Sequence, residues 1–270
     1  MHFDKKIWKK YVLGELSWKR LLRSVLSIYG CLFVFALVWS DKMIFQPQPA
    51  SYEDGEEVIK LVVDGGETVA ALYLVDPAAD YTVLYCHANA VDLGDIRPFL
   101  ARYRDEGFSV LAYDYRGYGV SEGRATARNA CADADTALRY LSEQEKISLD
   151  RIIVHGRSVG GGPALYLAHG NDVAGVIVES SFVTAYRVVT RVPLFPMDKF
   201  RNIAIVDEVD CPVLVIHGRE DETIPLWHGE MLFKAAKEPK SSCWLDDATH
   251  DSMSANDGEV YWAAIRAFVE

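Results

Sequence analysis

One short sequence limits what this chain can fold into: GRSVG at residues 156–160, directly after the apolar run 151–155. A G-x-S-x-G motif between a strand and a helix forms a sharp turn in which the serine has strained backbone angles. The residues two positions before and after the serine then lie so close together that only glycine, which lacks a Cβ atom, fits. The hydroxyl of Ser158 should stand above the sheet, where the N-terminal N–H groups of the next helix can stabilise an anion. The motif therefore predicts a serine hydrolase with Ser158 as its nucleophile.

Beyond residue 57 the chain alternates short apolar runs with segments of helical periodicity. The runs 58–63 and 68–75 flank Asp64-Gly65-Gly66 and predict a hairpin. The runs 82–86 and 109–113 are β-branched and aromatic, as buried parallel strands are. We expect strands at 82–86, 109–113, 151–155, 175–179, 213–217 and 243–245, and helices at 95–105, 126–144, 226–236 and 256–269. Alternating strands and helices predict the α/β class, with a mostly parallel, twisted sheet covered by helices on both faces.

A serine hydroxyl is a poor nucleophile unless a base accepts its proton, and the base needs a carboxylate to hold its tautomer. After such an elbow the chain order is serine, acid, histidine. Asp221 follows an apolar strand and is the favoured acid, with Glu220 and Glu222 as local rivals; an acidic, solvated loop is the other interpretation. His250, in a loop before the last helix, is the favoured base.

The remaining histidines are expected to have other roles. His155 and His217 end strands, where buried histidines with satisfied hydrogen bonds are usual. His228 follows the acidic loop on a predicted helix, for which we expect a surface position.

An oxyanion formed by attack on an acyl group needs two N–H donors. One is expected to be the backbone N–H of Val159, which follows the nucleophile. The other should come from the loop after strand 82–86, whose sequence is HANA. The backbone N–H of Asn89 is the first choice there, and that of Ala88 the second.

The N-terminal residues differ in character from the rest. Residues 1–23 hold seven basic and two acidic side chains, and Val25–Trp39 is apolar without a charge. We therefore interpret residues 1–45 as a basic amphipathic segment with a membrane anchor, and 46–270 as the catalytic domain, which begins with the linker QPQP at 46–49. The alternatives to a membrane anchor are a cleaved signal peptide, a helix in the core of the protein, and a helix that lies on the membrane surface.

Topology follows from the same charges. The positive-inside rule keeps a basic N-terminus in the cytoplasm and places the catalytic domain on the non-cytoplasmic side. Because Val25–Trp39 is short for a span, a surface-lying helix with a cytoplasmic catalytic domain remains open.

Composition narrows the partners. The net charge of −11 argues against a nucleic acid. The five cysteines are scattered, without a C-x-x-C pair, so we expect buried free thiols rather than a disulfide framework or a metal site.

Four segments carry a resemblance over nearly all of residues 45–270. They are HANA at 87–90, DYRGYGVSEG at 114–123, the GRSVG motif, and the stretch from Asp198 through CPVLVIHG at 211–218 to Asp221. They resemble the α/β-hydrolase superfamily, and more closely its membrane-anchored α/β-hydrolase domain-containing proteins, which include protein depalmitoylases and lysophospholipase-like enzymes. Two positions depart from that pattern: Ala88 stands where the family has glycine, and Thr249 where glycine often precedes the histidine.

The resemblance implies an α/β-hydrolase fold with a small cap insertion at about 180–210, preceded by an N-terminal hydrophobic helix. It also implies that a carboxylic ester or thioester of a lipid-like acyl group is cleaved through an acyl-enzyme on Ser158. That chemistry needs no metal and no cofactor. Two other functions stay open: an aminopeptidase-like amide hydrolase, and a membrane-tethered interaction module with a vestigial site.

The expected cap contains the apolar run Val192–Met197 with two prolines. This run could form an acyl-binding wall or a second membrane contact, or it could pack the cap on the core. Arg187 and Arg191 could meet an anionic headgroup, although solvation alone is the simpler interpretation.

Overall fold

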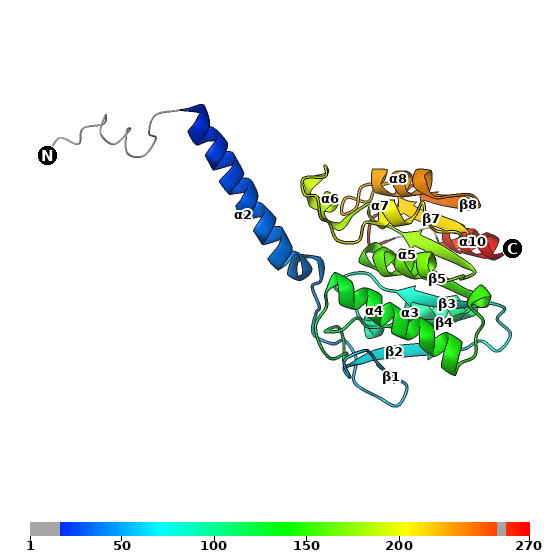
Figure 1. Cartoon of the computed structure of the whole chain (residues 1–270). Coiled ribbons are helices and arrows are strands. Elements are labelled where there is room, and N and C mark those ends of the chain that lie inside the picture. Colours follow the sequence, from blue (N-terminus) through cyan, green and yellow to red (C-terminus); the bar gives the residue numbers. More distant parts are fainter. Residues whose placement is uncertain (1–16, 253–257) are drawn as a thin grey trace. The chain divides into compact units, whose positions relative to one another are not determined.

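The computed structural model describes residues 17–252 and 258–270 (Figure 1). Its contacts separate a domain comprising Ile44–Glu270 from an N-terminal unit that ends at Met43. Most of the basic amphipathic segment expected at the N-terminus, residues 1–16, lies outside the described residues.

A single long helix, α2 (Trp18–Ile44), carries the apolar N-terminal sequence. Its 27 residues correspond to about 40 Å of helix, against about 30 Å for the hydrocarbon core of a bilayer. Its most apolar window has a mean hydropathy of 2.1, and none of that window is buried. The helix extends past both ends of the uncharged run Val25–Trp39, so the shortness of that run does not limit its length. By length and composition, α2 can cross a membrane.

The domain is built on one eight-stranded sheet in the order β1-β2-β4-β3-β5-β6-β7-β8 (Figure 1). β1 and β2 form the predicted antiparallel hairpin, β2 also pairs antiparallel with β4, and all other neighbours are parallel. Each of the strands β3, β4 and β6 has five residues, and all of them are buried, as expected for strands covered on both faces. The strands are β1 (Ile59–Val62), β2 (Thr68–Leu74), β3 (Thr82–Cys86), β4 (Ser109–Tyr113), β5 (Ile152–Arg157), β6 (Gly175–Glu179), β7 (Val213–Gly218) and β8 (Lys240–Leu245).

Helices cover both faces of the sheet, so that two separate apolar cores form. One core lies between the sheet and α4, α5 and α8, and Figure 1 shows α4 and α5 side by side in front of the strands. The other core lies under α3 and α10. The helices are α3 (Leu93–Asp105), α4 (Ala127–Arg139), α5 (Gly161–Gly170), α6 (Ala185–Thr190), α7 (Asn202–Ile205), α8 (Trp227–Ala235) and α10 (Gly258–Val269).

These elements confirm the fold expected from the sequence, with small shifts at element ends. The long helix predicted over 126–144 is α-helical only to Arg139 and continues as a π-helical turn, Tyr140–Gln144. α3 begins two residues before its predicted start, because Asp92 caps it: the carboxylate accepts from the backbone N–H groups of Gly94 and Asp95. The segment predicted as a cap contains the short helices α6 and α7.

Candidate active site

The predicted sharp turn lies between β5 and α5, at the carboxyl edge of the sheet. Ser158 has a backbone φ of +53°, in the left-handed region that residues other than glycine rarely adopt. A Cβ on Gly156 would overlap the carbonyl oxygen of Gly160, and one on Gly160 would overlap that of Cys86. Both glycines are therefore required by close approach, as the motif predicts.

The structure brings Ser158, His250 and Asp221 into one hydrogen-bonded line, although 92 residues separate the first two. The Nε2 atom of His250 lies 3.1 Å from the Oγ atom of Ser158, and its Nδ1 atom lies 2.8 Å from the Oδ2 atom of Asp221. One tautomer satisfies both contacts: Nδ1–H donates to the carboxylate, and Nε2 accepts from the serine hydroxyl. In this tautomer the imidazole is arranged to take a proton from Ser158.

Sheet topology explains why these three side chains meet. Ser158 follows β5, Asp221 follows β7 and His250 follows β8, and parallel strands end at the same edge of a sheet. Asp221 is buried, whereas its rivals Glu220 and Glu222 are exposed to solvent. Of the contacts that the structure gives for these three acids, the one with His250 is made by Asp221.

The loop that carries Asp221 is held by its own hydrogen bonds. The Oδ1 atom of Asp221 accepts from the backbone N–H of Ile224 at 2.7 Å. His217 donates from Nε2 to the carbonyl of Ile224 at 2.7 Å, and burial lowers the pKa of His217. A neutral His217 therefore closes the loop and leaves the Oδ2 atom of Asp221 directed at His250.

The three other histidines considered in the sequence are all buried. This confirms the burial expected for His155 and His217, although the Nδ1 atom of His217 has no hydrogen-bond partner among the described residues. The surface position expected for His228 is wrong. The first turn of α8 faces inward, and the Nδ1 atom of His228 accepts from the backbone N–H of Val183 at 3.2 Å. Burial lowers the pKa of His228 to about 4, so the ring is neutral near pH 7.

The loop after β3 lies beside the turn at Ser158, because Cys86 and Gly156 are register partners in adjacent strands. This brings Asn89 to the same edge of the sheet as Val159, the two predicted oxyanion donors. The side chain of Asn89 is fixed: its Oδ1 atom accepts from the hydroxyl of Tyr118 at 2.5 Å and from the backbone N–H of Gln46 at 2.9 Å.

The DYRGYG segment provides most of the support for this loop, a role that sequence reasoning did not assign. Tyr115 donates to the carbonyl of His87 at 2.8 Å, and Asp114 lies 3.4 Å from the Nε2 atom of His87. Burial raises the pKa of Tyr118 above its ordinary value, so its hydroxyl stays protonated as the donor to Asn89. In the sequence, the only sign of this role is that HANA and DYRGYG belong to the pattern of one family. No rule of sequence spacing links the two motifs.

The sequence alone also assigned no role to Arg157, the first of the two variable residues of the G-x-S-x-G motif. Its Nη2 atom donates to the carbonyl of His250 at 2.8 Å, and its Nε atom lies 3.3 Å from the buried carboxylate of Glu179. Glu179 also accepts from the hydroxyl of Tyr261 at 2.8 Å and lies 2.9 Å from the Nε2 atom of His155. A buried carboxylate thus orients the arginine that holds the loop of His250.

We expect the ionisation of Glu179 to make the stability of the fold depend on pH. Burial alone would raise its pKa, but the hydrogen bond from His155 and the charge of Arg157 outweigh burial and lower the pKa to about 2. A carboxyl group whose pKa is lowered in the folded state stabilises the fold at pH values above its ordinary pKa. This contribution is lost as the pH falls from about 5 to about 2. We expect Glu179→Gln to lower the unfolding free energy at pH 7 by roughly 2–3 kcal/mol.

Urea unfolding of the full chain in detergent, followed at several pH values, measures this effect. The difference between wild type and Glu179→Gln should shrink as the pH falls from 5 toward 2. The matched control is Glu259→Gln, an exposed carboxylate on α10. A difference that stays constant with pH would show that Glu179 is not the ionised partner of Arg157.

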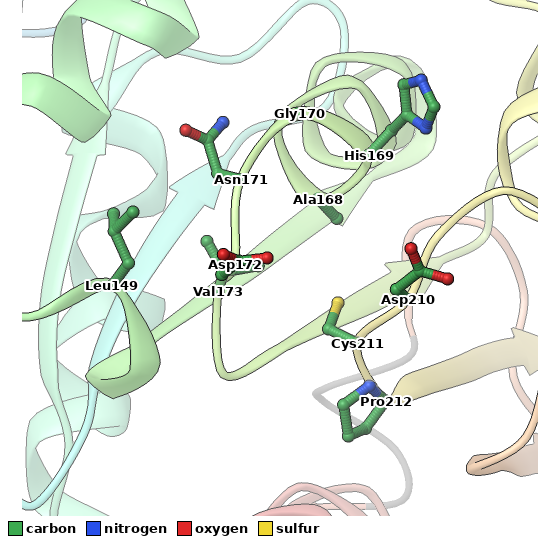
Figure 2. A pocket seen from close by; sticks show the side chains of 10 residues that line it. All are labelled: Leu149, Ala168, His169, Gly170, Asn171, Asp172, Val173, Asp210, Cys211 and Pro212. Carbon is green, nitrogen blue, oxygen red and sulfur yellow. The ribbon is translucent and has the colours of Figure 1, made fainter.

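The pocket in Figure 2 lies at the opposite edge of the sheet. Its volume is about 460 Å³. Its lining segments precede strands, around Leu149 before β5, residues 168–173 before β6, and residues 210–212 before β7. Ser158 and its partners all follow strands, so this pocket is separate from the candidate active site. Within the described residues, no group of three or more His, Cys, Asp or Glu side chains is placed to hold a metal ion.

Comparisons with known proteins agree with this fold. The profile of the family described as serine aminopeptidase, S33, matches residues 77–204. Alpha/beta hydrolase domain-containing protein 17B of Homo sapiens is 33% identical over 213 residues, which are 77% of this chain and 72% of that protein. Alpha/beta hydrolase domain-containing protein 17C of Mus musculus is 36% identical over 189 residues, which are 68% of this chain and 57% of that protein.

Solved structures share the fold. The esterase Pf2001 of Pyrococcus furiosus superposes with a TM-score of 0.70 at 18% identity. The superposition covers 84% of this chain and 97% of the esterase chain. An esterase from Exiguobacterium antarcticum superposes with a TM-score of 0.62 at 14% identity and covers 78% of this chain and 98% of its own. At such low identity, these likenesses show a common architecture alone.

Proposed function

We propose, for a chain that belongs to the α/β-hydrolase domain-containing family of serine hydrolases, that it cleaves carboxylic esters or thioesters through an acyl-enzyme on Ser158. The observation that carries this proposal is the line from Ser158 through His250 to Asp221. A buried carboxylate, an imidazole and a serine on a strained turn form the arrangement that acyl transfer needs.

The proposed reaction has two halves. His250 takes the proton of Ser158 as the Oγ atom attacks the acyl carbon, and the oxyanion accepts hydrogen bonds from the backbone N–H groups of Asn89 and Val159. Collapse of this intermediate breaks the bond to the leaving oxygen or sulfur, which receives the proton from His250. Water then attacks the acyl-enzyme with His250 as base, and this step releases the acid and regenerates Ser158.

Assays on the detergent-solubilised full chain test this proposal. We expect labelling by a fluorophosphonate and hydrolysis of p-nitrophenyl esters of graded acyl length, with a preference for longer chains if the substrate is lipid-like. A parallel series of acyl thioesters compares the two leaving groups. A chain that neither labels nor hydrolyses any of these compounds would favour the vestigial interaction module instead.

Amide hydrolysis is the second candidate, and one finding favours it: the matched family profile is described as a serine aminopeptidase. The same nucleophile and base serve amide and ester cleavage, so the site geometry is compatible with both. Aminoacyl p-nitroanilides distinguish them. A higher kcat/KM on these anilides than on any acyl ester would make the amide the substrate.

We infer that α2 anchors the enzyme in a membrane, with the catalytic domain on the non-cytoplasmic side. Support comes from the length and hydropathy of α2 and from the seven basic residues among positions 1–23. Protease added to intact spheroplasts should then digest the catalytic domain. Survival of that domain until the inner membrane is opened would establish the cytoplasmic orientation, and release by carbonate would show an interfacial helix.

The support of the proposed oxyanion loop leads to a further expectation. Tyr118→Phe removes the hydroxyl that donates to Asn89 and lies 3.0 Å from the backbone N–H of Gln46. We expect kcat for p-nitrophenyl butyrate to fall about tenfold with KM little changed, because the oxyanion forms only after binding. The matched control is Tyr166→Phe, whose hydroxyl contacts Asp135 on the surface. A change in KM alone would contradict a role in the oxyanion loop.

A further inference from the structure

We propose that residues 185–201, here called the cap segment, form a docking surface for an anionic lipid bilayer. The inference rests on the proposed function, because it explains how an acyl ester or thioester held in a membrane reaches Ser158. Four observations carry it: exposed apolar side chains, local charge, the position of the chain's entry into the domain, and the contacts between the cap segment and the turn at Ser158.

The cap segment exposes a cluster of apolar side chains. Val189 is 76% exposed, Val192 53%, and Leu194 and Met197 are each 51% exposed. Packing on the core, one of the interpretations of the run Val192–Met197, therefore does not describe its exposed side chains. Large exposed apolar side chains elsewhere in the described part of the domain lie on separate elements, as is usual for a soluble surface. They are Val62, Val75, Tyr166, Met231 and Val260. A cluster of this kind marks an interaction site.

Charge identifies the partner. The cap segment carries four basic side chains against one acidic side chain, Asp198. The remainder of residues 44–270 carries 16 basic and 35 acidic side chains. Anionic headgroups attract the cap segment and repel the rest of the domain, so the electrostatic field orients the domain with this segment toward the lipid. Pairing with the cap segment of a second copy fits less well, since it would oppose basic residues to basic residues.

The chain enters the domain beside this segment. Phe45, the residue after α2, is 4% exposed and packs its ring edge-on against Phe200 with the centroids 6.1 Å apart. Phe45 also contacts Tyr115 and Tyr118. The anchor is therefore joined to the domain through a residue that contacts the cap segment. Tethering also raises the effective concentration of lipid at the surface, so a weak contact is sufficient.

Contacts at both ends of the cap segment connect it to the proposed nucleophile. The hydroxyl of Ser181, just before the segment, donates to the carbonyl of Ser158 at 2.8 Å. Asn202, just after it, donates from Nδ2 to the carbonyl of Phe182 at 2.9 Å and lies 3.3 Å from the Oγ atom of Ser181. These contacts place both ends of the cap segment beside the turn at Ser158, at the carboxyl edge of the sheet.

The test uses the full chain in liposomes that contain phosphatidylglycerol. The variant combines Val189→Ser, Val192→Ser and Met197→Ser, and the control combines Val62→Ser with Val260→Ser on exposed sites far from the segment in sequence. We expect the cap variant to lose about tenfold in kcat/KM for a long-chain acyl thioester held in the bilayer and to keep its rate on soluble p-nitrophenyl butyrate. The control variant should keep both rates.

Other outcomes overturn the inference. Equal loss on both substrates would show that the segment only supports the fold, and no loss on either would remove the bilayer contact. A rate that depends on protein concentration would indicate a second copy as the partner. Replacing phosphatidylglycerol by phosphatidylcholine, or Arg191 and Arg201 by glutamine, should lower the bilayer rate about threefold, because the charge attraction is lost.

One readout does not require catalysis and so separates this inference from the proposed function. Hydrogen exchange of the full chain in nanodiscs should show slower exchange in residues 188–197 with anionic lipid than with zwitterionic lipid. The hairpin of β1 and β2 should exchange equally in both. Unchanged exchange in the cap segment would overturn the inference even if the enzyme hydrolyses acyl esters.

Discussion

Ser158→Ala should abolish hydrolysis while the protein stays folded. Every covalent step of the proposed reaction passes through the Oγ atom of Ser158, so we expect kcat to fall by about 10⁴- to 10⁶-fold. The backbone of the turn depends on Gly156 and Gly160 rather than on the hydroxyl, and the melting temperature should therefore change little. The rate on p-nitrophenyl butyrate, fluorophosphonate labelling and thermal unfolding of the same preparation measure these effects.

A matched serine outside the site gives the control. Ser142 follows α4, and its hydroxyl donates to the carbonyl of Leu138 within the same helical stretch. Ser142→Ala should retain both labelling and turnover. More than about 1% of wild-type turnover in Ser158→Ala would place the nucleophile elsewhere, because background catalysis without the nucleophile is far lower.

The second large effect is expected for Asp221→Asn. The amide would donate to the Nδ1 atom of His250, so that the proton moves to Nε2 and the ring can no longer accept from Ser158. We expect kcat to fall by about 10³- to 10⁴-fold, less than for Ser158→Ala because the nucleophile is still present. Steady-state kinetics with p-nitrophenyl butyrate measure the loss.

The neighbouring acids are the natural controls for that variant. Glu220→Gln and Glu222→Gln change the same charge in the same loop, but both side chains are exposed. Each should retain nearly wild-type kcat. If either lowers kcat more than Asp221→Asn does, Asp221 is not the residue that orients His250.

The features that depend on residues close together in the chain could be derived from the sequence. The turn at Ser158 needs glycine two residues away on each side, so the motif itself specified the geometry that the structure shows. Buried parallel strands are apolar throughout and the helices have one apolar face, so the strands, their order along the chain and the α/β class followed from periodicity. Parallel strands that end at one edge then accounted for the meeting of Ser158, Asp221 and His250.

The surroundings of these residues were decided by the tertiary structure. The hydrogen bonds from Tyr118 to Asn89 and from Arg157 to the carbonyl of His250 join residues 29 and 93 positions apart. Periodicity reports whether a side chain is buried, but not which distant group it meets, since that depends on strand order and loop path. His228 shows the same limit. Its helix was predicted correctly, yet the packing of α8 determined that this histidine faces inward.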